Sequence, residues 1–357
     1  MLRDKRVLIT GNHGYIGSVM APWLAGQGYD VRGFDTDYFY PCTLTPDATN
    51  IATVQKDLRD IEAEDLVGFD AVIHLAALSN DPIGNLNETW TREINGDGTI
   101  RLAQLAKKAG VRRFLFSSSC IMYGMSQADV VDETSPLAPQ TQYARSKVDA
   151  ENALRALADV DFSPTFCRNG TIYGLSPRMR FDTVLNNLMG SAFCTGRVVI
   201  HSDGTPWRPV VHVRDVTRAF HAILQAPRDV VHNQAFNVGS DELNHQIREL
   251  GEIVAETVPG CEFAMVPQAG ADQRTYKANF AKFKRTFPHF QFEWTARKGA
   301  EELYAAFREI GLTQAQFTDK RFTRLSWLRH LLESSAVDAS LHWSEAATAK
   351  PRVKVAV

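Results

Sequence analysis

The sequence predicts an α/β protein with a doubly wound parallel sheet and a smaller C-terminal lobe. Apolar strand-like runs alternate with helical patterns through the first 170 residues, and a glycine-rich turn follows the first run. After about residue 170, proline and glycine become frequent and the segments become shorter. The 357 residues, 44% hydrophobic and 22% charged, are ordinary for a globular protein and exclude a disordered chain or a coiled coil.

Six apolar runs are expected to form the strands of this sheet. They cover residues 7–10, 29–35, 51–56, 71–75, 111–117 and 162–168. Helical patterns cover residues 15–27, 88–109 and 141–158, between these runs. Strands that are separated by helices need right-handed crossovers, so the sheet should be parallel.

The change of pattern suggests where the lobes begin and end. Residues 1–170 should form the first lobe, and residues 210–240 should return to it. The second, substrate-binding lobe is expected from residues 171–209 and 241–345, with a flexible tail over 346–357. A ligand is expected in the cleft between the lobes.

Charge and cysteine usage narrow the class of protein. The net charge of −2 gives no positive field for nucleic acid or an anionic membrane. No apolar run reaches the roughly 18 residues of a membrane span, and the run after the charged N-terminus is too short for a signal peptide. The five cysteines are scattered without a CxxC pair, which fits a reducing cytoplasm and predicts neither disulfides nor a metal site.

A glycine-rich motif stands between the first strand and the first helix. Such glycines let the backbone approach a pyrophosphate, and the helix N-terminus adds free N–H groups. A plain glycine turn is the alternative. The motif favours a Rossmann-type dinucleotide site whose contacts include Gly11, His13, Gly14, Tyr15, Ile16 and Gly17.

An acidic residue, Asp35, ends the second strand. A carboxylate there accepts the ribose hydroxyl protons and repels a 2′-phosphate, so it favours NAD over NADP. Asp37 is an alternative carboxylate, Asp35 could instead be a loop cap, and Arg32 is a nearby cation that could accept a phosphate.

A phenol and an ammonium share one face of the third helix. Tyr143 and Lys147 are four residues apart, and a free tyrosine has a pKa of about 10. A nearby cation favours the phenolate, so Lys147 is expected to make Tyr143 a better general base. Ser117 and Ser119 lie at the carboxyl end of the fifth strand, where open sheets bind ligands. Taken alone, the pair could be a solvated helix face and the serines a capping turn.

Taken in order, these motifs resemble the extended short-chain dehydrogenase/reductase superfamily, and within it the nucleotide-sugar epimerases and dehydratases. The resemblance covers roughly residues 5–290 and rests on an ordered set: Gly11–Gly17, Asp35, His74-Leu75-Ala76-Ala77, Asn95 with Gly98-Thr99, Ser117–Gly124, and Tyr143 with Lys147. It implies an NAD-dependent enzyme with a nucleotide-diphosphate sugar as substrate. It also implies a homodimer formed through the helices at 88–109 and 141–158.

The resemblance assigns roles residue by residue. The catalytic residues would be Ser119, Tyr143 and Lys147. Further cofactor contacts would be Asp57, Leu58, Leu75, Ala76, Ala77, Asn95, Ser117, Tyr143 and Lys147. Substrate contacts would be Ser119, Thr171, Asn187, Leu188, Arg208 and Arg274.

Departures from the family pattern narrow the reaction. The 4,6-dehydratases carry Asp-Glu directly after the catalytic hydroxyl, whereas this chain has Cys120 and Ile121. The prediction is therefore an epimerase acting at C4 through a 4-keto intermediate. The alternatives are an NAD(P)H-dependent 4-keto-sugar reductase with the same catalytic residues, and a non-catalytic NAD-binding regulator. The related 3,5-epimerase/reductases carry a cysteine two residues after the catalytic hydroxyl, which Cys120 would match if Ser118 were the triad serine.

Overall fold

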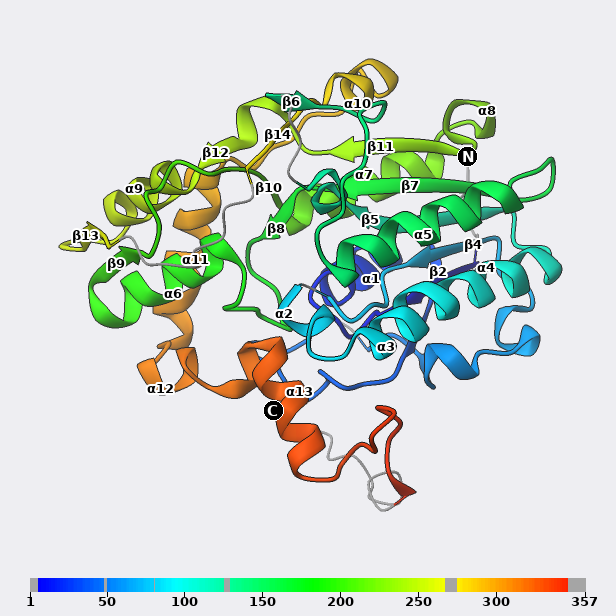
Figure 1. Ribbon diagram of the computed structural model, residues 1–357, viewed down its shortest axis with the longest axis horizontal. Coiled ribbons are helices and arrows are strands. Elements are labelled where there is room, and N and C mark those ends of the chain that lie inside the picture. The colour runs from blue at the N-terminus through cyan, green and yellow to red at the C-terminus, as the bar shows by residue number, and fades with distance from the viewer. Residues whose placement is uncertain (1–5, 48–49, 80, 125–128, 267–274, 346–357) are drawn as a thin grey trace.

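A seven-stranded parallel sheet forms the centre of the protein (Figure 1). The computed structural model describes residues 6–47, 50–79, 81–124, 129–266 and 275–345. The sheet order is β11-β7-β5-β4-β1-β2-β3, and all six expected strands lie in it. The strands are β1 (Arg6–Thr10), β2 (Asp30–Asp35), β3 (Thr53–Gln55), β4 (Ala71–His74), β5 (Arg113–Ser119), β7 (Ser163–Asn169) and β11 (Gln234–Val238). The predicted α/β fold is confirmed, and the order reverses beside β1, where such sheets bind ligands.

Helices cover both faces of the sheet because each strand alternates its side chains between them. Val7 and Ile9 of β1 pack with α1 (Gly17–Gly26) and α7 (Val213–Gln225). Leu8 points to the other face and packs in the core that contains α4 (Gly98–Lys108) and α5 (Gln142–Leu157). Both faces of β1 are therefore buried, as its continuous apolar run predicts.

The helical pattern at 88–109 folds as three joined pieces. It consists of α3 (Glu88–Thr91), a π-helical stretch (Arg92–Asp97) and α4. The wide turn carries Asn95, whose side chain accepts a hydrogen bond from the Leu78 N–H at 2.8 Å and donates one to its carbonyl at 3.0 Å. Asn95 therefore braces the chain that leaves β4.

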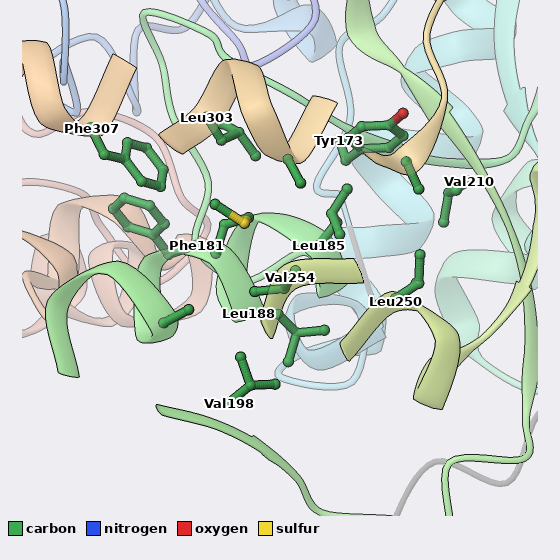
Figure 2. Packing of buried hydrophobic residues seen from close by; sticks show 14 of the residues in the cluster. Tyr173, Phe181, Leu185, Leu188, Val198, Val210, Leu250, Val254, Leu303 and Phe307 are labelled. Atoms are coloured by element: carbon green, nitrogen blue, oxygen red, sulfur yellow. The ribbon is translucent and has the colours of Figure 1, made fainter. Parts of the chain in front are cut away.

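The second lobe packs around its own apolar core. A three-stranded sheet of β8 (Thr171–Tyr173), β10 (Trp207–His212) and β12 (Asn244–Gln246) lies beside the pair β9 (Arg197–Ile200) and β13 (Glu262–Met265). Three helices, α6 (Val184–Thr195), α9 (Ile247–Thr257) and α11 (Ala296–Ile310), enclose the core, where the rings of Phe181 and Phe307 meet edge-on at 5.8 Å (Figure 2). The shorter elements are α2 (Asp81–Gly84), β6 (Val130–Val131), α8 (Arg228–Val231), β14 (Lys277–Ala278), α10 (Ala281–Thr286), α12 (Gln314–Phe317) and α13 (Arg324–Glu333).

Segments beyond residue 210 are shared between the two cores. Strand β11 joins the seven-stranded sheet, while β10 pairs within the second lobe. From the 241–345 stretch, Phe283 packs on the sheet core and α13 packs against Tyr38 and Cys42 of the first lobe. The expected tail at 346–357 lies outside the described residues. Within the described part of the chain, no helix is long and apolar enough to cross a membrane.

Candidate active site

A cavity of about 860 Å³ lies at the carboxyl ends of the strands and is lined by both lobes. Most of the predicted site residues line it: Gly11, His13, Gly14, Tyr15, Ile16, Gly17, Asp35, Asp57, Leu58, Leu75, Ala76, Ala77, Ser117, Ser119, Tyr143, Thr171, Asn187, Leu188 and Arg208. Asn95 braces Leu78 and is not part of the lining, and Lys147 is buried behind it. Arg274 lies outside the described residues.

The glycine-rich loop is packed too closely for side chains at two of its glycines. A Cβ on Gly11, whose φ is +77°, would stand 2.7 Å from the backbone nitrogen of Ala76. A Cβ on Gly17 would stand 2.2 Å from the carbonyl oxygen of Gly11. The loop can therefore lie flat against the end of β4 and bring backbone close to a bound pyrophosphate.

The carboxylate of Asp35 is fixed at the end of β2. It accepts hydrogen bonds from the backbone N–H of His13 at 3.0 Å and of Asp37 at 2.8 Å, and burial raises its pKa. The alternative carboxylate, Asp37, contacts His13 Nδ1 at 2.6 Å. Arg32 pairs with Asp30 at 3.2 Å and does not line the cavity. The Asp35 carboxylate therefore fits the ribose hydroxyls of NAD. The Arg32 guanidinium is not in the cavity lining, where it could accept a 2′-phosphate.

A buried histidine joins the strand ends beneath the cavity. His74 Nδ1 lies 2.6 Å from the Thr10 hydroxyl, and its Nε2 lies 2.8 Å from the Thr99 hydroxyl. Burial lowers the pKa of His74 to about 3, so the ring is neutral at physiological pH. This motif residue connects β1, β4 and α4 and holds the cofactor side of the cavity together.

Helix α5 brings Tyr143 and Lys147 to the strand ends. Lys147 Nζ donates to the Ser117 carbonyl at 2.8 Å and lies 5.6 Å from the centre of the Tyr143 ring. The Ser119 hydroxyl faces the cavity and accepts a hydrogen bond from the Ile121 N–H at 3.3 Å. One turn after Lys147, buried Glu151 anchors the helix.

Burial dominates the ionisation of Tyr143 and Lys147, the predicted catalytic pair. It raises the pKa of Tyr143 to about 12; Asp81 acts in the same direction, and the Arg180 guanidinium opposes it. Burial also lowers the pKa of Lys147 to about 7, against the pull of Glu151. The expected depression of the tyrosine pKa by Lys147 is therefore not found, because desolvation outweighs nearby charge.

Arg180 is a cavity residue that the sequence analysis missed. Its Nε pairs with Asp182 at 2.8 Å, its Nη1 donates to the Ser79 hydroxyl at 3.2 Å, and its side chain is 11% exposed. The signal was present in the sequence as two arginines followed by an aspartate in a loop that enters the cleft, Arg178-Met-Arg180-Phe-Asp182. Thr323, Arg324 and Leu325, far along the chain, also line the cavity.

The two residues after Ser119 bring no carboxyl group to the cavity. The Cys120 thiol is fully buried, donates to the Arg168 carbonyl at 3.2 Å and does not line the cavity. Burial raises the pKa of this thiol. Ile121 lines the cavity. The Ser118 hydroxyl, the alternative triad serine of the 3,5-epimerase/reductase pattern, donates to Glu151 at 2.7 Å.

The second lobe contributes four of the predicted substrate contacts to the lining of the cavity. Arg208, on β10, donates from Nη1 to the Trp207 carbonyl at 2.8 Å. Asn187, on α6, donates to the Phe181 carbonyl at 2.8 Å. Thr171 begins β8, and Leu188 follows Asn187. These residues of the second lobe line the same cavity as the glycine-rich loop.

The NAD dependent epimerase/dehydratase family model matches residues 7–239, and the chain belongs to this family. A UDP-glucose 4-epimerase of Bacillus subtilis is 28% identical over 84% of this chain and 94% of its own length. A UDP-glucose 4-epimerase of Mycolicibacterium smegmatis is 31% identical over 71% and 82%. The chain is therefore an enzyme of the extended short-chain dehydrogenase/reductase type.

Solved structures share the fold. MoeE5 in complex with UDP-glucose and NAD is 27% identical, covers 85% of this chain and 99% of its own, and has a TM-score of 0.72. DesIV, a dTDP-glucose 4,6-dehydratase of Streptomyces venezuelae with NAD bound, is 25% identical over 87% and 99%, with a TM-score of 0.73.

Proposed function

We propose that the protein is a nucleotide-sugar epimerase that inverts C4 of the sugar through a transient 4-keto intermediate. The observation that carries this proposal is a single cavity lined by the glycine-rich loop, by Ser119 and Tyr143, and by Arg208 on the opposite lobe. Such an arrangement lets one substrate reach the cofactor with its sugar and the second lobe with its diphosphate.

The chain's own residues supply proton transfer and orientation. NAD, when bound, supplies the acceptor and donor of hydride. Tyr143 takes the proton of the C4 hydroxyl, and the Ser119 hydroxyl holds the same oxygen. Lys147, which donates to the Ser117 carbonyl and lies beside Tyr143, would hold the cofactor ribose. Arg180 is the cation that favours the phenolate.

The two residues that follow Ser119 favour epimerisation over water elimination. Elimination needs an acid and a base beside the reacting sugar carbons. Cys120 is buried with its thiol on a backbone carbonyl, and Ile121 presents an apolar side chain to the cavity. A dehydratase such as DesIV is therefore a relative in fold.

The substrate class rests on the second lobe and on the relatives. Arg208, with Thr171, Asn187 and Leu188, is proposed to hold the nucleoside diphosphate, since a guanidinium suits phosphate oxygens. A UDP-sugar is favoured because the Bacillus subtilis and Mycolicibacterium smegmatis relatives are UDP-glucose 4-epimerases. A homodimer through α4 and α5 stays a prediction.

Replacement of Tyr143 by Phe tests the proposal. Purified wild type should release NAD⁺ on denaturation and interconvert UDP-glucose and UDP-galactose or a related pair of UDP-sugars. Tyr143→Phe should lose turnover by at least a hundredfold yet keep its NAD, because only the phenol oxygen is removed. Tyr304→Phe is the control, since that ring packs on Phe193 away from the cavity.

The same measurements separate the alternatives. A 4-keto-sugar reductase would be isolated without tightly held NAD⁺ and would consume NADH in stoichiometric amounts. A non-catalytic regulator would bind NAD and show no turnover with any nucleotide sugar. Either result, or full activity in Tyr143→Phe, would contradict the proposal.

A further inference from the structure

The C-terminal segment, residues 313–345, folds back onto the cofactor side of the cavity. It leaves the second lobe after α11 and continues through α13, which lies beside the first lobe (Figure 1). At the start of α13, Thr323, Arg324 and Leu325 line the cavity. A segment distant in sequence therefore completes a wall of the cofactor site.

Hydrogen bonds fasten this segment to the loop that follows β2. The Trp327 indole donates to the Tyr38 carbonyl at 2.6 Å, and the Trp343 indole donates to the Thr36 carbonyl at 2.6 Å. The Tyr38 hydroxyl donates to the Leu341 carbonyl. Thr36 and Tyr38 themselves line the cavity, and they directly follow Asp35, the predicted ribose contact. The segment is therefore hydrogen-bonded to the loop beside the predicted ribose site.

Two further hydrogen bonds hold the segment beside Asp57 and Leu58, two of the predicted cofactor contacts. Arg59, which holds Asp57 with its Nε at 2.9 Å and Nη2 at 2.8 Å, donates from Nη1 to the Ser340 carbonyl at 2.6 Å. The Trp90 indole, on α3, donates to the Ala339 carbonyl at 3.0 Å. The segment thus contacts the loop after β2, the turn at residues 58–60 after β3, and α3.

Arg324 is a buried cation with a free donor. Its side chain is fully buried, and Nη2 donates to the Arg178 carbonyl at 2.9 Å. Among the described residues, its Nη1 has no hydrogen-bond partner. The guanidinium lies 4.4 Å from the centre of the Phe39 ring. A buried guanidinium nitrogen without a partner is costly, and Arg324 is a lining residue of the cavity. This combination points to an anionic ligand beside Arg324.

The neighbouring arginines are already matched to carboxylates. Arg178 makes a two-pronged contact with Asp47 at 2.9 and 2.8 Å, and Arg180 pairs with Asp182 at 2.8 Å. The side-chain hydrogen bond of Arg324 goes to a neutral carbonyl. Burial and the nearby Arg180 lower the pKa of Arg324 to about 10, so it is still charged at pH 7.

The location of Arg324 selects the pyrophosphate of the cofactor as that anion. Phe39, beside the Arg324 guanidinium, lies in the loop after Asp35. The neighbouring Arg180 donates a hydrogen bond to Ser79, in the chain that follows β4 and the predicted cofactor contacts Ala76 and Ala77. The residues proposed to hold the substrate diphosphate belong to the second lobe. We propose that the C-terminal segment is a cofactor clasp in which Arg324 faces the NAD pyrophosphate across the cavity from the glycine-rich loop.

The clasp makes a kinetic prediction that follows from the NAD dependence of the family. A dinucleotide bound between the glycine-rich loop and Arg324 can leave only when the C-terminal segment detaches, which breaks the Trp343 hydrogen bond to Thr36. NAD would then be retained through purification and through many turnovers. This property suits an enzyme that regenerates its cofactor in each cycle.

The test measures NAD release directly. Protein loaded with 1,N6-etheno-NAD is mixed with excess NAD, and the fluorescence change gives the dissociation rate. Arg324→Gln should release the probe about ten- to a hundredfold faster, the loss expected for a charge-assisted hydrogen bond. Trp343→Phe, which keeps an aromatic ring but loses the N–H to Thr36, should release it about two- to tenfold faster.

Arg329→Gln is the matched control, because it removes the same charge from an exposed position on the same helix. Circular dichroism reports folding, and if Arg324→Gln does not fold, Arg324→Lys takes its place and should still speed release. Release by the folded Arg324 variant at the rate of the wild type and of Arg329→Gln would overturn the clasp. So would weaker UDP binding with unchanged NAD release, which would assign Arg324 to the substrate. Neither readout requires turnover, so a failed epimerase assay leaves the result interpretable.

Discussion

Glu151 on α5 should contribute strongly to the stability of the protein, and the substitution Glu151→Gln tests this. Its carboxylate is 2% exposed and accepts hydrogen bonds from the Ser118 hydroxyl at 2.7 Å and from Arg168 Nε at 3.0 Å and Nη2 at 2.8 Å. Removing the charge leaves Arg168, only 4% exposed, as a buried cation without its partner. Breaking a buried pair in this way costs about 3–5 kcal/mol.

Urea unfolding followed by circular dichroism measures that loss as a lower free energy of unfolding. The control is Arg145→Gln on the same helix, which breaks a 3.6 Å pair with Glu88 whose partners are 44% and 66% exposed. That change should cost at most about 1 kcal/mol. A Glu151→Gln protein within about 1 kcal/mol of wild type would refute the argument.

The same substitution has a second consequence with a defined sign. Glu151 opposes the burial that lowers the pKa of Lys147 to about 7. Without the carboxylate that pKa falls further, and a lysine carries its charge only below its pKa. The charged form of Lys147 is then lost at a lower pH than in wild type, so the pH profile of turnover should change as well as the stability.

Two other residues allow direct tests of the cavity. Asp35→Ala should weaken the preference for NAD over NADP by about tenfold or more, measured as the ratio of their dissociation constants, because the carboxylate that repels a 2′-phosphate is gone; an unchanged ratio would move this role to Asp37. Arg208→Ala should weaken UDP binding about ten- to a hundredfold in calorimetry, whereas Arg197→Ala, a 65% exposed arginine on β9, should not. Equal affinities in both arginine variants would remove Arg208 from the diphosphate site.

The sheet was predictable because its strands obey a local rule. Val7–Ile9 and Ala71–Ile73 are continuous apolar runs, and each is buried on both faces in the structure. The strand ends then follow from topology, which brings Gly11, Asp35 and Ser119 to one cavity. The apolar pattern of the strands and their parallel direction are therefore enough to predict where the expected cofactor contacts meet.

The remaining wall depends on long-range folding that local patterns do not encode. Arg324 reaches the cavity because Trp327 and Trp343 fasten the C-terminal segment to the loop after β2. No spacing or motif in that segment indicates a partner almost 300 residues earlier. Asn95 illustrates a finer limit, because a π-helical turn directs it to the Leu78 backbone while its sequence reads as ordinary helix.

The catalytic pair shows why the cavity contains an arginine beside its tyrosine. Burial, which would protect the proposed keto intermediate from water, raises the pKa of Tyr143 to about 12 and lowers that of Lys147 to about 7. An ammonium loses its charge in such a place as the pH rises through neutrality, whereas a guanidinium keeps its charge. Arg180 is buried at 11% exposure, pairs with Asp182 and is the cation that lowers the pKa of the phenol. The charge that favours the phenolate at neutral pH therefore comes from the group whose own ionisation survives burial.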